Sequence, residues 1–341
     1  MKDYLKKLAA KENLSFEEIN DIVTKIANNE ASEAQIGAFL VGITLKEVNK
    51  EEFYAFSYAM RKFARRVITD EFVVDSCGTG ADFSGTINIS TSPAIIANAC
   101  GAKVVKQTNS SITSACGSSD FLHALGIKIV QTPEQALEEF HKNGIVFVHS
   151  PYFNDFAKVN NPIRQQIGIK TIFNYLGPMI NPAFPNAQLL GVSSNEMCSK
   201  MAYALQKLGT KHAIVVNGIN PNIDEISLCS KSTIFEVKDN KINEYTVTPE
   251  DFGFKTVELS ELQGGSSADN ARIITEIFKG DRKDSRYNMI CLNAGAMLYL
   301  YGLEDSINSG IKLAKNAISD GLVYAKLQDL QKSSQMAPIL K

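Results

Sequence analysis

The sequence lacks the features that mark several large classes of protein. It contains no tryptophan and only four histidines, and no apolar run approaches the roughly 18 residues that a membrane helix needs. Its first residues include no continuous apolar segment of the kind that a secretory signal requires. We therefore expect a protein that has no membrane partner and works in the cytoplasm.

Neither sign of charge is in large excess. Lys and Arg total 35 against 37 Asp and Glu, so the formal net charge is -2. A chain this close to neutrality has no global field that attracts nucleic acid, which argues against nucleic acid as a partner. Any binding site for an anion must therefore be local.

The cysteines argue against a zinc site, and the overall composition is that of a globular protein. The six cysteines form no CxxC pair and have no nearby histidine to indicate a zinc site, so we interpret them as buried thiols. Hydrophobic residues make up 44% and charged residues 21%, as in ordinary globular proteins. A length of 341 residues predicts one large domain with a smaller one beside it.

Two regions with different periodicity divide the chain. Residues 1–66 carry apolar residues at helical spacing without any proline, which predicts a small N-terminal helical-bundle domain. Residues 70–341 alternate short apolar runs with helical stretches, which predicts a large α/β domain with a largely parallel central sheet covered by helices. The fold class is therefore α/β. Three helix starts in the bundle are marked by capping-box pairs: Ser15 with Glu18, Ser32 with Gln35, and Asn49 with Glu52.

Within the large domain, the pattern predicts individual elements. A helical segment near residues 160–180 is expected to rejoin the bundle, with Asn161 as N-cap and Pro162 at the first helical position. Two packed helices are expected near the C-terminus, the second ended by Gly321. Strands are predicted in residues 72–80, 101–106, 127–130, 144–150, 212–218 and 232–237.

The glycine-rich segment 75–99 is the most informative one. Gly78 and Gly80 can adopt positive φ and have no side chains, so their backbone N–H groups can approach an anion closely. Asn88, Ser90 and Thr91 then lead into a helix whose free N–H groups can face a second anion. The spacing matches neither GxGxxG nor a P-loop. A plain glycine turn before a capped helix remains the alternative at this point.

Polar residues follow other predicted strands as well. Lys106 ends one strand and precedes a loop in which seven of the residues from Thr108 to Ser119 are Ser or Thr, a composition that can wrap a phosphate. The adjacent carboxylates Asp224 and Glu225 follow another strand and suit Mg²⁺. Ligand sites in open α/β sheets gather at such strand ends. Taken singly, the first segment is better explained as a solvated polar loop and the second as a surface acidic pair; their position at neighbouring strand ends is what favours a binding site.

Arg164 is the remaining candidate. It lies in the stretch NNPIRQQIGIKTIFNYLGPMINPA, where several prolines and a glycine predict a fixed turn beside the helix. Its guanidinium fork matches a substrate carboxylate, although most lone arginines on helices are solvated. The histidines stand in no motif, and we assign no catalytic residue.

Five motifs in order give the chain a specific resemblance between about residues 70 and 230. The series DxxGTGxD, NIST, KxxN with a Ser-rich loop and GSxD, PIRxxxGIxTIFNxLGPxxNP and DEIS resembles the anthranilate phosphoribosyltransferases of tryptophan biosynthesis, whose fold is related to nucleoside phosphorylase II. The resemblance implies transfer of the 5-phosphoribosyl group from phosphoribosyl pyrophosphate to the amine of anthranilate, with release of pyrophosphate. It also implies a homodimer with two Mg²⁺ per subunit.

The same resemblance implies roles for single residues. It places the metal on Ser90, Asp224 and Glu225, and the aromatic acceptor near Gly78, Gln107, Asn109, Arg164 and Pro178. It places the donor on Gly78, Thr79, Gly80, Ala81, Asp82, Thr86, Asn88, Ser90, Thr91, Lys106, Asn109 and Ser118.

The chain departs from the family pattern mainly on the acceptor side. The family usually reads KHGNR where residues 106–110 read KQTNS, GTGGD has become GTGAD, and a double arginine has become Arg164 followed by Gln165. One alternative therefore keeps the donor chemistry but uses a different aromatic or heterocyclic amine. A second is a catalytically silent relative that binds nucleic acid. A third is a pyrimidine or thymidine phosphorylase, against which the NIST and LGPxxNP segments speak.

Overall fold

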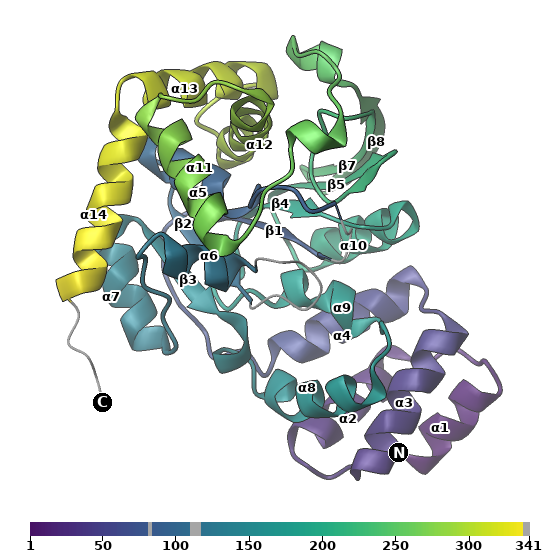
Figure 1. Ribbon diagram of the computed structural model, residues 1–341. Helices are drawn as coiled ribbons and strands as arrows, with labels where there is room; N and C mark the ends of the chain where they lie inside the picture. Colours follow the sequence, from purple (N-terminus) through teal and green to yellow (C-terminus); the bar gives the residue numbers. More distant parts are fainter. Residues whose placement is uncertain (81–83, 110–116, 337–341) are drawn as a thin grey trace.

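The computed structural model describes residues 1–80, 84–109 and 117–336. The chain begins with four helices, α1 (Lys2–Ala9), α2 (Phe16–Ala27), α3 (Glu33–Lys46) and α4 (Lys50–Arg61), which Figure 1 shows as a separate bundle beside the sheet. Helices α2, α3 and α4 each start at the predicted capping box, in which the cap side chain and the third helical residue exchange hydrogen bonds. These three predictions are confirmed.

Within the described residues, the region after the bundle is built on one sheet of eight strands. Its order is β3-β2-β1-β4-β5-β7-β8, with β6 paired to β5, and the strands from β3 to β5 run parallel while β7 and β8 are antiparallel. The predicted α/β class with a helical N-terminal part is confirmed. The strands are β1 (Val74–Gly78), β2 (Val104–Thr108), β3 (Ile145–His149), β4 (Ala187–Gly191), β5 (His212–Ile219), β6 (Asn222–Ile223), β7 (Ser232–Lys238) and β8 (Lys241–Val247).

Helices cover both faces of this sheet. Because side chains alternate along a strand, Leu189 of β4 joins the core under one set of helices and Leu190 joins the core on the opposite face. The second core continues into the helical bundle, so the bundle and the sheet share buried contacts. The remaining α-helices are α5 (Thr91–Ala99), α6 (Ser118–Ala124), α7 (Pro133–Asn143), α8 (Asp155–Ile167), α9 (Phe173–Leu176), α10 (Asn195–Lys207), α11 (Ser267–Lys279), α12 (Ser285–Tyr301), α13 (Ile307–Ser319) and α14 (Leu322–Met336).

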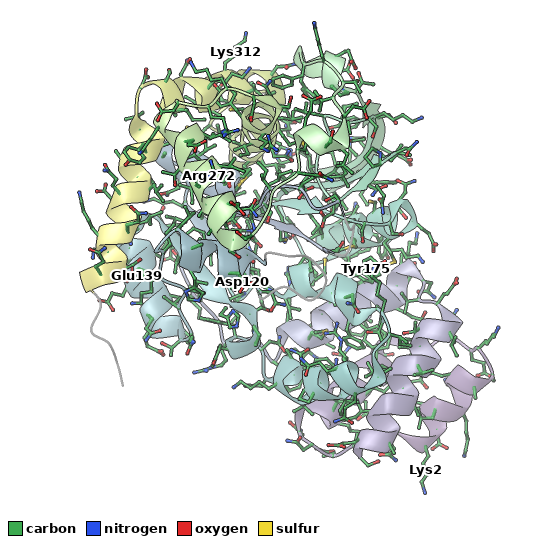
Figure 2. The ribbon with its side chains drawn as sticks, viewed as in Figure 1. Lys2, Asp120, Glu139, Tyr175, Arg272 and Lys312 are labelled. Atoms are coloured by element: carbon green, nitrogen blue, oxygen red, sulfur yellow. The ribbon has the colours of Figure 1, made fainter. Side chains whose placement is uncertain are left out.

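Charged side chains are spread over distant parts of the surface. Figure 2 shows Lys2 on the bundle and Arg272 and Lys312 on the helices above the sheet, with Tyr175 of α9 between the bundle and the sheet. No helix of the described residues is long and apolar enough to cross a membrane.

One predicted strand does not form, and one predicted helix start is wrong. Residues 127–130 form no strand: only Val130 makes an isolated bridge, to Val148, and the N–H of Lys128 donates instead to the Ser334 hydroxyl. Helix α8 begins at Asp155 rather than at Asn161, because Asn154 caps it by accepting the N–H of Ala157. Pro162 therefore lies inside the helix, where it removes one backbone donor. Helix α8 contacts α2 and α3 of the bundle.

The C-terminal helices and the cysteines also differ in part from expectation. Helices α12 and α13 pack together, and α13 ends just before Gly321, which has a φ of +76°, as predicted. Helix α14 follows it and was not expected. Only Cys198 and Cys291 are buried thiols, whose pKa is raised by burial to about 12, whereas three other described cysteines are half-buried. Cys116 lies outside the described residues.

Candidate functional site

A cavity of about 440 Å³ lies at the carboxyl ends of the parallel strands. Its walls come from the segments after β1, β2 and β5, from α8 of the bundle side, and from the short stretch formed by α9 and the 3-10 helix Gly177–Ile180. Among the predicted site residues, it brings together Gly78, Thr79, Gly80, Thr86, Asn88, Ser90, Lys106, Gln107, Asn109, Ser118, Arg164, Pro178, Asp224 and Glu225. Ala81 and Asp82 lie outside the described residues, as does most of the Ser-rich loop.

The glycine loop after β1 is joined to the acidic pair. The N–H of Gly80, a residue with a φ of +66°, donates to Oδ2 of Asp224 over 2.7 Å, and the N–H of Thr79 donates to the Gly191 carbonyl. A Cβ on Gly78 would lie 2.3 Å from Asp224 Oδ2. Gly78 is therefore needed for close approach and not, as expected, for positive φ. The Gly80 amide, which was predicted to face an anion, thus donates to a carboxylate of the protein itself.

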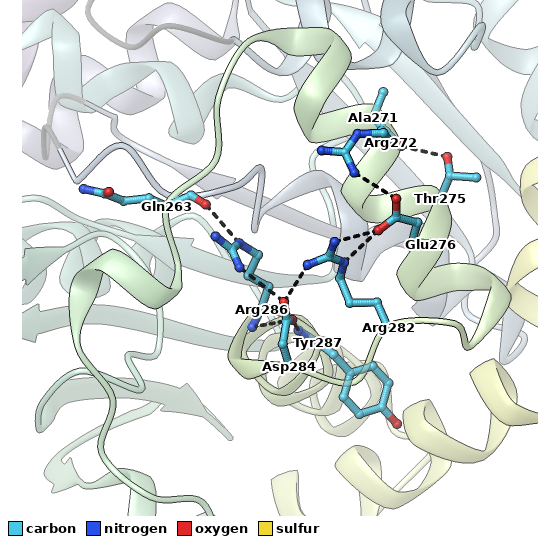
Figure 3. A network of polar contacts seen from close by, with 9 residues as sticks. All are labelled: Gln263, Ala271, Arg272, Thr275, Glu276, Arg282, Asp284, Arg286 and Tyr287. Atoms are coloured by element: carbon cyan, nitrogen blue, oxygen red, sulfur yellow. Dashed lines mark hydrogen bonds and ion pairs between the residues drawn. The ribbon is translucent and has the colours of Figure 1, made fainter.

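The other half of the glycine-rich segment pairs with a part of the chain that no motif marked. Thr86 forms an antiparallel bridge with Gln263, the N–H of Ile87 donates to Leu262, and the N–H of Gly264 donates to Gly85. Figure 3 shows how Arg286 in turn donates to the Gln263 carbonyl and joins a chain of ion pairs through Asp284, Arg282, Glu276 and Arg272. The cavity wall at Thr86 is thereby fixed.

Helix α5 begins under the loop, and Asn88 is its effective cap. Asn88 Oδ1 accepts the N–H of Thr91 over 2.9 Å, and its carbonyl accepts the Ser92 hydroxyl. This leaves the Ser90 hydroxyl at the cavity wall. Thr91, in contrast, is fully buried and does not line the cavity, so its side chain lies behind the site rather than in it.

Lys106 lies inside β2 and not at its end, because the strand continues to Thr108. Its side chain is buried, and its ammonium donates to the Ser76 carbonyl and, over 3.4 Å, to the Ser90 hydroxyl. Burial lowers the pKa of Lys106, although Asp75 and Glu225 oppose this shift. Burial raises the pKa of Asp75, whose Oδ2 accepts the amide of Asn181. A buried lysine thus lies beside Ser90 at the wall of the cavity that the glycine-rich segment forms.

The acidic pair and Ser90 supply oxygen donors that fit magnesium. Asp224 is held by the Gly80 amide, and the loop packs so tightly that a Cβ on Gly191 would lie 1.4 Å from the Asp224 carbonyl oxygen. The described residues contain no cluster of three or more metal-ligating side chains. Two carboxylates and a hydroxyl match an ion that completes its coordination with water and substrate phosphates.

The opposite wall is the stretch 177–182, whose backbone carbonyl groups accept hydrogen bonds from side chains of other segments. Pro178 stands in the first turn of the short 3-10 helix Gly177–Ile180, and Pro182 follows that helix and cannot continue it. Side-chain donors from four places bind this stretch: Gln107 to Gly177 O, Gln188 to Pro178 O, Arg61 to Met179 O and Arg66 to Pro182 O. These arginines and glutamines were not predicted to have this role. No local pattern marks the contacts of Arg61, Arg66 and Gln107, whose partners are at least 70 positions away in the chain.

Arg164 lies on the cavity side of α8. Its Nη1 donates to Asn161 Oδ1 over 3.1 Å, and no described carboxylate lies within ion-pair distance. Burial lowers its pKa, but an arginine side chain stays protonated in proteins. The neighbouring wall is apolar, with Phe156 stacked on Phe173 at 5.5 Å between ring centroids. A fixed positive charge beside aromatic rings suits a planar carboxylate.

Asn109 and Ser118 close the remaining side. The N–H of Asn109 donates to the Ser118 hydroxyl over 3.0 Å, and that hydroxyl donates back to the Asn109 carbonyl. The two ends of the Ser-rich loop are thereby held together at the cavity.

Comparison with known proteins places the chain in a family. Residues 2–64 match the model of the glycosyl transferase family helical bundle domain, and residues 70–324 match that of its a/b domain. Anthranilate phosphoribosyltransferase from Methanosarcina acetivorans is 39% identical over 97% of this chain and 89% of its own length, and that from Thermoanaerobacter sp. is 38% identical over 97% of both chains.

Solved structures show the same fold. Anthranilate phosphoribosyltransferase from Thermus thermophilus superposes with a TM-score of 0.90 at 32% identity, covering 97% of this chain and 99% of that one. The enzyme from Saccharomyces cerevisiae, solved in complex with PRPP and Mg, has a TM-score of 0.90 at 24% identity over 98% of both chains, which shows the shared fold. The chain described here belongs to the anthranilate phosphoribosyltransferase family.

Proposed function

We propose that the cavity binds phosphoribosyl pyrophosphate against the glycine-rich segment and anthranilate against α8, and that the enzyme transfers the phosphoribosyl group from one to the other. The observation that carries this proposal is that Ser90, Lys106 and the acidic pair border the same cavity as Arg164. An anionic donor and an anionic aromatic acceptor can therefore be held side by side.

On the donor side, the hydroxyls of Thr86 and Ser90 and the amide of Asn88 face the sugar and its phosphates, while Lys106 supplies a positive charge beneath them. Asp224, Glu225 and Ser90 hold Mg²⁺, two ions per subunit by the family resemblance. Bound Mg²⁺ neutralises negative charge that grows on the pyrophosphate leaving group. The protein's part is to hold these oxygens in place before the reaction.

On the acceptor side, Arg164 binds the carboxylate and Phe156, Phe173 and Pro178 contact the aromatic ring. Gln107 is fixed by Ser150 and Gly177 and borders the amine. An arylamine already has a free lone pair near neutral pH, so its orientation toward C1 of the ribose is what the enzyme must provide.

We further propose a cytoplasmic homodimer in which residues 1–66, together with α8, form the small domain and residues 70–341 the large one. The shared core between α8 and α2 supports this grouping, because α8 packs on the bundle although it follows β3 in sequence. Motion between the two parts would open and close the cavity, whose walls they both supply.

The test is a direct assay. Protein, Mg²⁺ and phosphoribosyl pyrophosphate are mixed with anthranilate, and the loss of anthranilate fluorescence and the release of pyrophosphate are followed. We expect equal amounts of both, and neither when Mg²⁺ is replaced by excess chelator. Pyrophosphate release with other arylamines but not with anthranilate would favour the alternative acceptor that Gln107 allows. Salt-dependent retention on a polyanion column without turnover would contradict the proposal and favour a nucleic-acid binder.

A further inference from the structure

Helix α8 presents a polar side chain to the cavity that no motif marks. Phe156, Asn160 and Arg164 follow one another at intervals of four residues, so they lie on one face of the helix, and all three line the cavity. Asn160 is 1% exposed, and its Oδ1 has no hydrogen-bond partner in the part of the chain that the structure describes.

A buried amide oxygen without a partner needs an explanation. Buried polar atoms in folded proteins are almost always hydrogen-bonded, because an unsatisfied one loses its bonds to water without replacement. Asparagine is also a poor residue for a helix interior, so an apolar side chain at this position would serve the helix and its packing better. The contacts within the described residues do not explain why an asparagine stands at position 160. A ligand that donates a hydrogen bond to its amide oxygen would explain it.

A second acceptor atom of the same kind lies on another wall of the cavity. The amide nitrogen of Gln107 donates to the Gly177 carbonyl, which can only accept, and this fixes the orientation of the side-chain amide. Its buried Oε1 is consequently an acceptor, and it too has no partner among the described residues. The cavity is therefore bordered by two unsatisfied acceptors and one arginine. Its complement is a molecule that carries a carboxylate and N–H groups.

We propose that Asn160 is a specificity-determining residue of the acceptor subsite, whose amide oxygen accepts an N–H of the acceptor's amino group while Arg164 holds its carboxylate. The proposal rests on the proposed function and assigns recognition of the acceptor's amine to Asn160. A terminal amide torsion is broad, so a rotation of the Asn160 side chain suffices to meet the ligand. Because the amine donates through hydrogen, its lone pair stays available for attack on C1.

The experiment compares two ligands that differ only in the amine. Anthranilate and benzoate are titrated calorimetrically into protein with Mg²⁺ present, for the wild type, Asn160→Leu and Asn161→Ala. We expect Asn160→Leu, which is similar in size, to weaken anthranilate about tenfold and to leave benzoate unchanged. Asn161→Ala is the matched control: because Asn161 bonds Arg164, this variant should weaken both ligands by a similar factor.

Thermal unfolding separates this role from a structural one. Since Asn160 Oδ1 makes no hydrogen bond within the described part of the fold, Asn160→Leu should unfold at the same temperature as the wild type or higher. An unchanged ratio of anthranilate to benzoate affinity, or an equal loss for both ligands, would overturn the proposal. Turnover of anthranilate by the wild type is measured in parallel. Turnover with an unchanged ratio sinks only the role of Asn160, whereas absence of turnover sinks the proposed function itself.

Discussion

The backbone N–H of Gly80 donates to the carboxylate of Asp224 across 2.7 Å, although 144 positions separate the two residues in the chain. This bond ties the loop that follows β1 to the loop that follows β6, and both loops border the cavity. The glycine loop and the acidic pair consequently act as one unit, and a change in either is expected to disturb the other.

The Asp224 carboxylate accepts the Gly80 N–H and is proposed to bind Mg²⁺. Asp224→Asn should separate these two roles. The amide oxygen of asparagine can still accept the Gly80 N–H, so the fold should be preserved, but the charge that attracts Mg²⁺ is lost. We expect kcat/KM to fall by about 100-fold, together with a higher Mg²⁺ concentration at half-maximal rate. Steady-state rates across a Mg²⁺ titration measure both. Asp305→Asn, at an exposed position, is the control and should match the wild type.

Gly191→Ala should damage the same unit by crowding. Its Cβ would fall 1.4 Å from the Asp224 carbonyl oxygen, which forces the loop to move and lowers the free energy of unfolding by about 1 to 3 kcal/mol. Gly37→Ala offers the matched comparison, because a Cβ there meets no atom within 4 Å inside helix α3. That variant should be more stable by about 0.5 to 1 kcal/mol. Denaturant unfolding measures both; equal stability of the two variants would contradict the close approach.

Lys106→Met should weaken the donor and change the pH profile. A buried lysine with a lowered pKa loses its proton at a lower pH than an ordinary lysine, and only the charged form attracts pyrophosphate. In the wild type, kcat/KM for the donor should therefore decline as pH rises through this lowered pKa, below the usual 10.5. The variant should lose that decline and show a donor KM about tenfold higher. Lys255→Met, an exposed lysine, should retain the wild-type profile.

Arg164→Ala should act on the acceptor alone. If its guanidinium pairs with a carboxylate, the acceptor KM rises by a factor equivalent to about 1.5 to 3 kcal/mol, while the donor KM stays the same. Initial rates with each substrate varied in turn give both constants. An acceptor KM equal to that of the control Arg65→Ala, an exposed arginine just after α4, would remove Arg164 from the site.

Arg61→Met should weaken acceptor binding although Arg61 does not line the cavity. Arg61 Nε donates to the Met179 carbonyl over 2.7 Å and its guanidinium stacks on the ring of Phe184, so it fixes the turn that carries Pro178. Its loss leaves a carbonyl without its donor, which should cost about 1 to 3 kcal/mol of stability. We also expect a higher acceptor KM and an unchanged donor KM. Arg65→Met is the comparison, because Arg65 is exposed and donates to the Tyr152 carbonyl only across a long 3.4 Å.

The sequence predicted most of the site because polar residues directly follow apolar strands. Gly78, Lys106 and Asp224 each stand near the end of such a run, and parallel strands place those ends at one edge. The same reasoning failed for residues 127–130, since so short an apolar or amphipathic run cannot distinguish a strand from a turn. It also placed the start of α8 too late, because Pro162 fits a first turn well but is tolerated here in the interior.

What the sequence could not show are contacts between distant segments. Arg61 and Gln263 belong to no motif, and their roles depend on partners that lie far away in the chain. Asn160 was not predicted for a different reason. Its proposed role rests on a buried oxygen that has no hydrogen-bond partner in the described part of the fold, and no sequence pattern marks such an atom.

The bridge between Thr86 and Gln263 has a consequence for how much of the chain substrate binding requires. Every recognisable motif lies before residue 230, yet the edge of the glycine-rich segment is braced by residues 262–264 and by the arginine that holds them. A fragment that kept all the motifs and stopped short of this brace would retain the chemical groups but lose the backbone that sets their spacing. The final third of the chain, which carries none of the motifs, is thus needed to keep the active centre in shape.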